Sequence, residues 1–147
     1  MHYQLRLLDP TVPLGRFLNL EEAAGWLGGI IDGEGSVIMA QKVNDRRRRK
    51  QGIYWDRYIE FTNTDWGLIE AGMEAYRALG MQPILRARKA PVNPKWKQAW
   101  IVTIRSRRDL KRFAQVIRLH SAAKAEKVAA AVASYSTKPQ YTLRRGS

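Results

Sequence analysis

The stretch from residue 23 to residue 36 reads AAGWLGGIIDGEGS, an apolar segment in which glycines recur at helical spacing. A glycine inside a helix costs on the order of 1 kcal/mol relative to alanine. Gly25, Gly29 and Gly33 are four residues apart and share one helix face, which Gly28 widens. Because bare glycines let a second backbone approach closely, this stripe indicates that the helix contacts either a second copy of the chain or a strand of the same chain.

Two carboxylates lie where this helix ends. We expect the helix to run from Leu20 to Asp32 and to stop at residues 33–35, so that Asp32 and Glu34 lie at its C-terminus. The negative end of the helix dipole disfavours acidic side chains there unless a positive charge compensates them. A divalent cation would do so, and Mg²⁺ prefers carboxylate and phosphate oxygens. The pair is therefore a candidate metal site.

Hydrophobic periodicity and capping residues divide the rest of the chain. Asn19 and Glu22 open the first helix at capping-box spacing. Strands are predicted at residues 36–43, 53–63, 82–90 and 96–105, and further helices after Thr64 or Asp65 up to Leu79, after Ser106 or Asp109 up to about Leu119, and after Ser121 up to about Ser134. The order α-β-β-α-β-β-α plus one helix predicts one α+β domain over residues 1–147, a four-stranded antiparallel sheet with helices on one face. We expect an N-terminal arm over residues 1–18 and a flexible basic tail over residues 135–147.

The chain carries 26 Lys and Arg against 13 Asp and Glu, a net charge of +13 in 147 residues. Such a surplus opposes compaction and implies a polyanionic partner. Nucleic acid is favoured over a membrane surface because no predicted helix is uniformly basic on one face. The lack of cysteine excludes thiolate metal sites. No stretch is apolar enough to span a membrane and residues 1–18 do not read as a signal peptide, so we expect an intracellular protein of the cytoplasm, the nucleoid or an organelle.

The nine residues LGGIIDGEG, from Leu27 to Gly35, resemble the signature motif of the LAGLIDADG homing endonucleases. The predicted order of elements is that of the family, and FTNTDWGLIEAGMEAYRALG, residues 61–80, is similar to the segment after the second strand in many members. The resemblance covers about residues 20–131 and includes one copy of the motif. It implies the αββαββα LAGLIDADG fold, with the sheet as a saddle over double-stranded DNA. One motif per chain implies an intron-encoded type of enzyme that cuts a long pseudo-palindromic target as a homodimer.

The resemblance also implies the metal site and the dimer contact. The second acid of the motif binds the catalytic metal in the family, and here it is Glu34, a glutamate in place of the more usual aspartate. The backbone at Gly33 would help coordination. The implied cofactor is Mg²⁺, with Mn²⁺ able to substitute and Ca²⁺ supporting binding without cleavage. The implied dimer interface comprises Gly25, Gly28, Gly29 and Asp32, the last supporting the helix terminus.

Three peripheral residues are further candidates for the catalytic site. Asn63 stands where relatives often place a polar residue that orders the catalytic water. Lys124, and after it His120, are candidates for the basic residue that relatives use near the scissile phosphate. Each has a structural alternative: Asn63 as a strand-end or turn residue, and the other two as structural or phosphate-binding residues.

The family pattern directs alternate side chains of the first two strands toward DNA. These are Ile38, Ala40, Lys42, Asn44, Tyr54, Asp56, Tyr58 and Glu60. On the third predicted strand Arg86 and Arg88 alternate around Ala87, with Lys89 next in sequence. Because arginine to guanine is the commonest specific contact, these two arginines are the best candidates for reading bases.

A run of five cations falls in the connection between the first two strands. It consists of Arg46, Arg47, Arg48, Arg49 and Lys50. At a hairpin tip it would follow the phosphate backbone and add affinity without sequence information; a nuclear-localisation tract and a solvated loop are the alternatives. A second group would either do the same or form a solvated helix face: Arg105, Arg107, Arg108, Lys111 and Arg112.

Three other functions share parts of this pattern: an intron maturase or RNA-binding relative on the same fold, a DNA-binding regulator without catalysis, and a ribosomal-type RNA-binding protein. Intact Asp32 and Glu34 favour cleavage, although maturases can retain these acids. Magnesium-dependent cutting of DNA separates an endonuclease from the first two. The third gives no reason for a glycine stripe beside two acids.

Overall fold

The computed structural model describes residues 13–43, 50–136 and 140–143. In chain order, its elements are α1 (Leu20–Glu34), β1 (Gly35–Val43), β2 (Lys50–Asn63), α2 (Trp66–Ala78), β3 (Ile84–Ala87), β4 (Trp100–Ile104), α3 (Arg107–Val116), α4 (Ala122–Ala133), the 3-10 turn η2 (Ser134–Ser136) and β5 (Gln140–Leu143). The predicted order of helices and strands is therefore confirmed. Four predicted N-caps form, each side chain accepting a backbone N–H of the first helical turn: Asn19, Asp65, Ser106 and Ser121.

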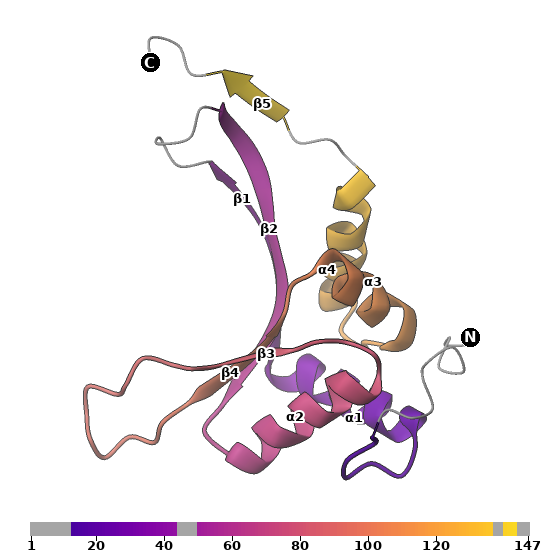
Figure 1. Cartoon of the computed structure of the whole chain (residues 1–147), viewed down its shortest axis with the longest axis vertical. Coiled ribbons are helices and arrows are strands. Elements are labelled where there is room, and N and C mark those ends of the chain that lie inside the picture. The colour runs from indigo at the N-terminus through magenta and orange to yellow at the C-terminus, as the bar shows by residue number, and fades with distance from the viewer. Residues whose placement is uncertain (1–12, 44–49, 137–139, 144–147) are drawn as a thin grey trace.

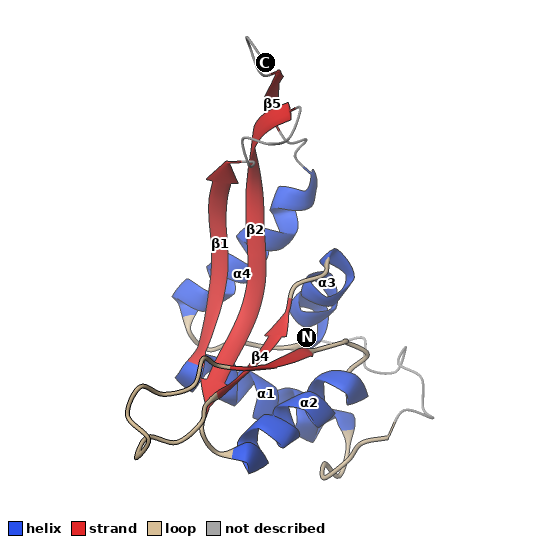
Figure 2. Cartoon of the chain, turned by 60° about the vertical axis from the view of Figure 1, so that its left-hand side comes forward, coloured by secondary structure: helices blue, strands red, loops and turns tan. Residues whose placement is uncertain are grey.

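The strands form one antiparallel sheet in the order β1-β2-β4-β3. The long strand β2 has three partners, because β1 pairs along one of its edges while β4 and β5 pair with opposite ends of the other. The helices lie on one side of the sheet, with α4 beside the β1–β2 ribbon and α1 and α2 beneath the end where β4 pairs (Figure 1). The opposite face carries none of the described helices (Figure 2). The predicted α+β layering is confirmed.

Several predicted boundaries were wrong. Helix α1 continues through Glu34, and the backbone N–H of Gly35 still donates to the Ile31 carbonyl. The third and fourth strands are shorter than predicted, because residues 88–99 leave the sheet in a turn-rich connection that contains Pro91 and Pro94, which lack the N–H that a strand ladder needs. Part of the predicted flexible tail, residues 140–143, forms β5 on the edge of β2.

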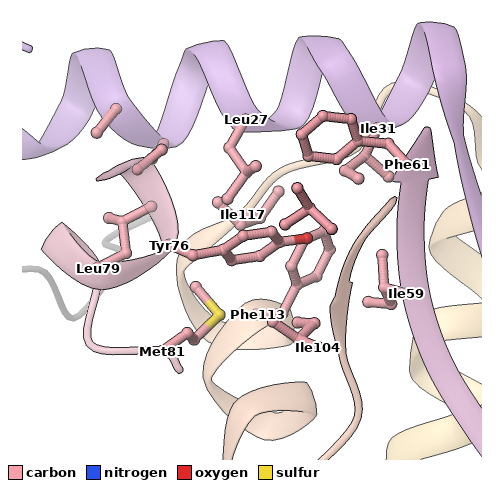
Figure 3. Packing of buried hydrophobic residues seen from close by; sticks show 14 of the residues in the cluster. Leu27, Ile31, Ile59, Phe61, Tyr76, Leu79, Met81, Ile104, Phe113 and Ile117 are labelled. Atoms are coloured by element: carbon pink, nitrogen blue, oxygen red, sulfur yellow. The ribbon is translucent and has the colours of Figure 1, made fainter. Parts of the chain in front are cut away.

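The core lies between the helices and the inner face of the sheet (Figure 3). Its largest fully buried side chains come from every layer, among them Leu27, Ile31, Ile59, Phe61, Tyr76, Ile104 and Phe113. Helix α2 approaches the sheet closely at Gly72, where an added Cβ would lie 2.3 Å from Cζ of Phe61. In the described part of the chain, no helix has both the length and the apolar character that a membrane crossing requires.

Helices α1 and α4 cap each other. The Asp32 carboxylate, near the end of α1, accepts the backbone N–H groups of His120 and Ser121 at 2.9 Å each, just where α4 begins. In return, Lys124 in the first turn of α4 donates from Nζ to the carbonyl oxygens of Ile31 at 2.8 Å and Asp32 at 2.7 Å. The C-terminal turn of α1 and the segment that opens α4 therefore hold each other by hydrogen bonds to backbone groups.

This reciprocal cap corrects the expectation that a bound cation compensates Asp32. The compensation comes instead from the N-terminus of α4, an electropositive helix end, and from the ammonium of Lys124. The hydrogen bond from the His120 backbone, aided by that from Ser121 and by the nearby charges of His120 and Lys124, lowers the pKa of Asp32 below its ordinary 3.8 despite the opposing effect of desolvation. Glu34, the neighbouring acid, is left out of this network and exposed.

We predict that Asp32→Asn lowers the free energy of unfolding by about 1 kcal/mol at neutral pH, the usual cost of a lost cap. Because the folded-state pKa of Asp32 is depressed, its ionised form stabilises the fold at pH values above 3.8, and this stabilisation disappears as the pH falls through the lower folded value. Urea unfolding from pH 7 to pH 2.5 should show the difference between wild type and variant shrinking below about pH 4. A difference that stays constant across this range would contradict the cap.

Candidate active site and nucleic-acid interface

Glu34 and Asn63 meet where α1 and β2 both end. The amide Nδ2 of Asn63 donates to Oε2 of Glu34 at 2.8 Å. The amide oxygen of Asn63 accepts the backbone N–H of Asp65 at 2.7 Å. Since Asp65 is the N-cap of α2, the Asn63 side chain is oriented by the start of that helix and presents its N–H₂ group to the carboxylate. The contact fixes an exposed acid that would otherwise rotate freely.

The other predicted catalytic residues lie at the same end of α1 but in different roles. The ammonium of Lys124 lies on the last carbonyls of α1, two and three residues before Glu34. His120 is exposed and contributes its backbone N–H to the reciprocal cap. Gly33 is exposed beside Glu34. The geometry thus brings Glu34 and Asn63 into contact, while the contacts of Lys124 and His120 belong to the reciprocal cap.

The donor atoms around Glu34 fit a hard cation only in part. Among the described residues no group of three or more His, Asp or Glu side chains could hold a metal ion. One chain offers the Glu34 carboxylate and the Gly33 carbonyl, whereas Mg²⁺ takes about six oxygen ligands in octahedral geometry. The remaining ligands would have to come from water, from a phosphate or from another copy of the chain. The Asn63 amide donates here and is not itself a ligand.

The glycine stripe divides into exposed and buried members. Gly25, Gly29 and Gly33 are exposed, and a Cβ added at any of them meets no atom within 4 Å. Gly28 is buried, and its added Cβ would lie 2.9 Å from the carbonyl oxygen of Arg118. The assignment of Gly28 to a dimer interface is therefore corrected, because it packs on the loop after α3 within its own chain. Asp32 is likewise engaged within the chain.

The open face of the sheet carries the side chains that the alternation predicted. In the β1–β2 ladder Ile38 is opposite Tyr58, Ala40 opposite Asp56, and Lys42 opposite Tyr54. The intervening pair Val37 and Ile59 is buried toward the helices. Glu60 continues the open face onto β4, where it is opposite Thr103. Arg86 is exposed on β3, and Arg88 and Lys89 are exposed just beyond it.

The predicted DNA contacts in the connection between β1 and β2 fall largely outside the described residues. Asn44 and the arginines at 46–49 lie outside the described residues. Lys50 begins β2, and its backbone pairs with Leu143 of β5.

Sequence reasoning did not assign Arg105 to this face. The guanidinium of Arg105 lies 5.4 Å from the ring centroid of Tyr58 and forms an ion pair with Asp56 at 3.2 Å. The signal was present in the sequence, because Thr103 and Arg105 alternate with the buried Val102 and Ile104 and so extend the open side of β4 by one residue. The prediction left Arg105 between a phosphate contact and a solvated helix face, and it did not use this period.

Three solved structures with this fold are similar to the chain. The Group I intron-encoded homing endonuclease I-CeuI complexed with DNA has 15% identity and a TM-score of 0.57, over 90% of this chain and 60% of that one. The homing endonuclease I-TnaI has 14% identity and a TM-score of 0.55, over 76% of this chain and 71% of that one. The I-LtrWI LAGLIDADG homing endonuclease bound to target DNA has 18% identity and a TM-score of 0.58, over 90% of this chain and 41% of that one. The comparison with curated proteins gives no match.

At these identities the structural matches demonstrate a shared fold, and the chain spans less than two thirds of the length of I-CeuI. Sequence adds an independent line. Residues 21–118 match the model of the LAGLIDADG-like domain, a stretch well over half of the chain that runs from the second residue of α1 to just beyond the end of α3. The chain therefore belongs to the LAGLIDADG-like domain family.

Proposed function

We propose that this protein is a site-specific homing endonuclease that makes a double-strand break in a long pseudo-palindromic DNA target by metal-dependent hydrolysis as a homodimer. The observation that carries the proposal is the exposed carboxylate of Glu34, oriented by the 2.8 Å hydrogen bond from Asn63. Glu34 is the last residue of α1, the helix whose exposed glycines have no atom within 4 Å of an added Cβ. The solved relatives with this fold are homing endonucleases, two of them bound to DNA.

Dimerisation follows from what one chain lacks. A single chain has one Glu34, and cutting two DNA strands needs two catalytic centres. The exposed stripe of Gly25, Gly29 and Gly33 lies on the same helix as this carboxylate. Packing of two copies of α1 along the stripe would bring two Glu34 residues together about a twofold axis, and a twofold enzyme reads a two-fold related target.

The role assigned to this chain's residues is to position a cation and an attacking water around a phosphodiester. A bound Mg²⁺ would supply Lewis acidity, lowering the pKa of water and stabilising negative charge on the leaving 3′-oxygen. Glu34, with the Gly33 carbonyl, would hold the cation, and Asn63 would keep the carboxylate in one rotamer. Water attacks the phosphorus, and the bond to the 3′-oxygen breaks, so no side chain of the protein forms a covalent bond to the substrate. The ammonium of Lys124 adds positive charge beside the site.

The open sheet face is the proposed DNA-binding surface. A two-stranded antiparallel ribbon fits the major groove, where base edges are distinguishable, and β1 and β2 form such a ribbon over their whole paired length. Arg86 on β3, with Arg88 and Lys89 just beyond that strand, adds exposed positive charge beside the ribbon. Mixed charges here supply both phosphate contacts and base readout.

We predict that Glu34→Gln lowers the rate of DNA cleavage at least on the order of 100-fold, since even outer partners of metal ligands change activity by roughly 10- to 100-fold. DNA binding should change little, because the amide keeps the shape of the side chain. The target is first obtained by selecting cleaved duplexes from a random library in Mg²⁺. Cleavage is then timed on the selected site, and binding is measured in Ca²⁺.

The matched control is Glu21→Gln, which removes the same charge from an exposed glutamate in the first turn of the same helix. It should cleave like wild type. Retained turnover by Glu34→Gln would contradict the metal assignment. Wild-type protein that binds duplex equally well in EDTA and never cuts would instead identify a DNA-binding regulator, and preferential RNA binding would identify the maturase class.

We predict that Gly29→Leu converts the dimer to a folded monomer. An added side chain at Gly29 meets open space within the chain, so the substitution should leave folding intact while separating two helices whose backbones must approach closely. Sedimentation velocity measures the change in mass, and thermal unfolding followed by circular dichroism reports the fold.

The control for added bulk is Ala130→Leu, at an exposed position of α4. It should remain a dimer. An unchanged sedimentation coefficient for Gly29→Leu, or a wild type that sediments as a monomer at every concentration and with DNA, would rule out this interface.

A further inference from the structure

Two acids of β2 lie on the open face amid cations from three other segments. Asp56 forms two ion pairs, each with a nitrogen–oxygen distance of 3.2 Å. Its Oδ2 pairs with Nζ of Lys42 on β1, and its Oδ1 pairs with Nη2 of Arg105, after β4. Four residues along β2, Glu60 pairs with Arg86 of β3 at 3.6 Å. Its Oε2 also lies 3.5 Å from the Thr103 hydroxyl. The acids thus form the centre of a cross-strand array.

The array is layered. The side chains of Asp56 and Glu60 are only 19% and 23% exposed, whereas their three cationic partners are 53–61% exposed. The acids therefore lie at the sheet surface and the cations extend above them. Arg105 is further oriented by the Tyr58 ring, 5.4 Å below its guanidinium. A planar guanidinium held on one edge by a carboxylate keeps its other donors in a defined direction.

Acids on this face oppose the main source of DNA affinity. A chain of net charge +13 binds duplex through phosphate contacts that carry no sequence information. Each carboxylate on the binding face repels phosphate and engages a cation that could otherwise contact it. Placing acids there lowers affinity for every sequence. Discrimination is a difference between affinities. It increases if the acids weaken phosphate contacts, which arbitrary DNA relies on, more than they weaken base contacts at the target.

We propose that Asp56 and Glu60 are specificity-determining residues that act through their cations. They hold Lys42, Arg86 and Arg105 as oriented donors for base edges and prevent these side chains from settling on phosphates of any sequence. The inference rests on the proposed DNA-binding function of this face, and it assigns the acids a positioning role. Removing either acid raises affinity for arbitrary DNA and reduces discrimination between sequences.

The test compares Asp56→Asn and Glu60→Gln with Glu126→Gln, which removes the same charge from an exposed residue of α4, on the helix side of the sheet. Fluorescence anisotropy with a pool of random duplexes measures non-specific affinity as a function of salt, without Mg²⁺. Each open-face variant should bind roughly 3- to 10-fold more tightly near 0.1 M salt. The slope of log affinity against log salt should steepen by about one for each cation that reaches a phosphate. Glu126→Gln should leave both the non-specific affinity and its salt dependence close to those of wild type.

A second readout separates positioning from net charge. Duplexes selected by binding from a random library should show a weaker sequence bias for Asp56→Asn and Glu60→Gln than for wild type and Glu126→Gln. The conservative Asp56→Glu, which keeps the charge, should retain most of the bias. Circular dichroism establishes that each variant is folded, and the two acids provide independent tests.

The possible outcomes separate the two proposals. If wild type binds and cuts DNA while the open-face variants behave like Glu126→Gln, the specificity role is overturned and the proposed function stands. Unchanged sequence bias after loss of either acid overturns it too. If wild-type protein does not bind duplex DNA at all, the proposed function itself fails.

Discussion

The reciprocal capping of α1 and α4 is the interaction on which the rest of the site depends. Asp32 accepts the N–H groups of His120 and Ser121, the two residues that precede α4, and Lys124 donates to two carbonyls in the last turn of α1. Four short hydrogen bonds therefore fix the end of the helix that carries Glu34. The same contacts fix α4, which packs along the β1–β2 ribbon. The carboxylate and the open sheet face are in this way held in one rigid arrangement, which the proposed reaction would require.

Charge is distributed to suit these two regions. Asp32 is bound by backbone donors, which leaves Glu34 as the acid exposed at the end of α1. On the open face the acids Asp56 and Glu60 are the less exposed partners of their cations. These four carboxylates therefore lie at a helix end, at the candidate metal site and beside the cations of the open face. None of these roles follows from the net charge, which sets only the attraction to a polyanion.

Local signals in the sequence predicted the order of α1 to α4 and β1 to β4, because a cap or a strand alternation involves residues only a few positions apart. Asn19 and Ser121 were predicted as caps, Asp65 was one of two candidates with Thr64, and alternation assigned the open face of β1 and β2. Contacts between distant residues left no such signal. The bond from His120 to Asp32 spans 88 positions, and helical spacing could not reveal that Gly28 packs on Arg118 while Gly29 is exposed. The edge strand β5 was missed because its four residues depend on β2 for their pairing.

In the proposed dimer, two copies of α1 meet so that their Glu34 residues face one DNA target. The chain has no cysteine, so Ser36→Cys, at an exposed position two residues after Glu34, gives one spin label per subunit. Double electron–electron resonance then measures the distance between the two subunits' labels with duplex DNA bound. Helices packed at about 8–10 Å predict a narrow distribution at short distance, roughly 10–25 Å including the label arms. A distribution centred far beyond this range, or no dipolar coupling at all, would contradict the account.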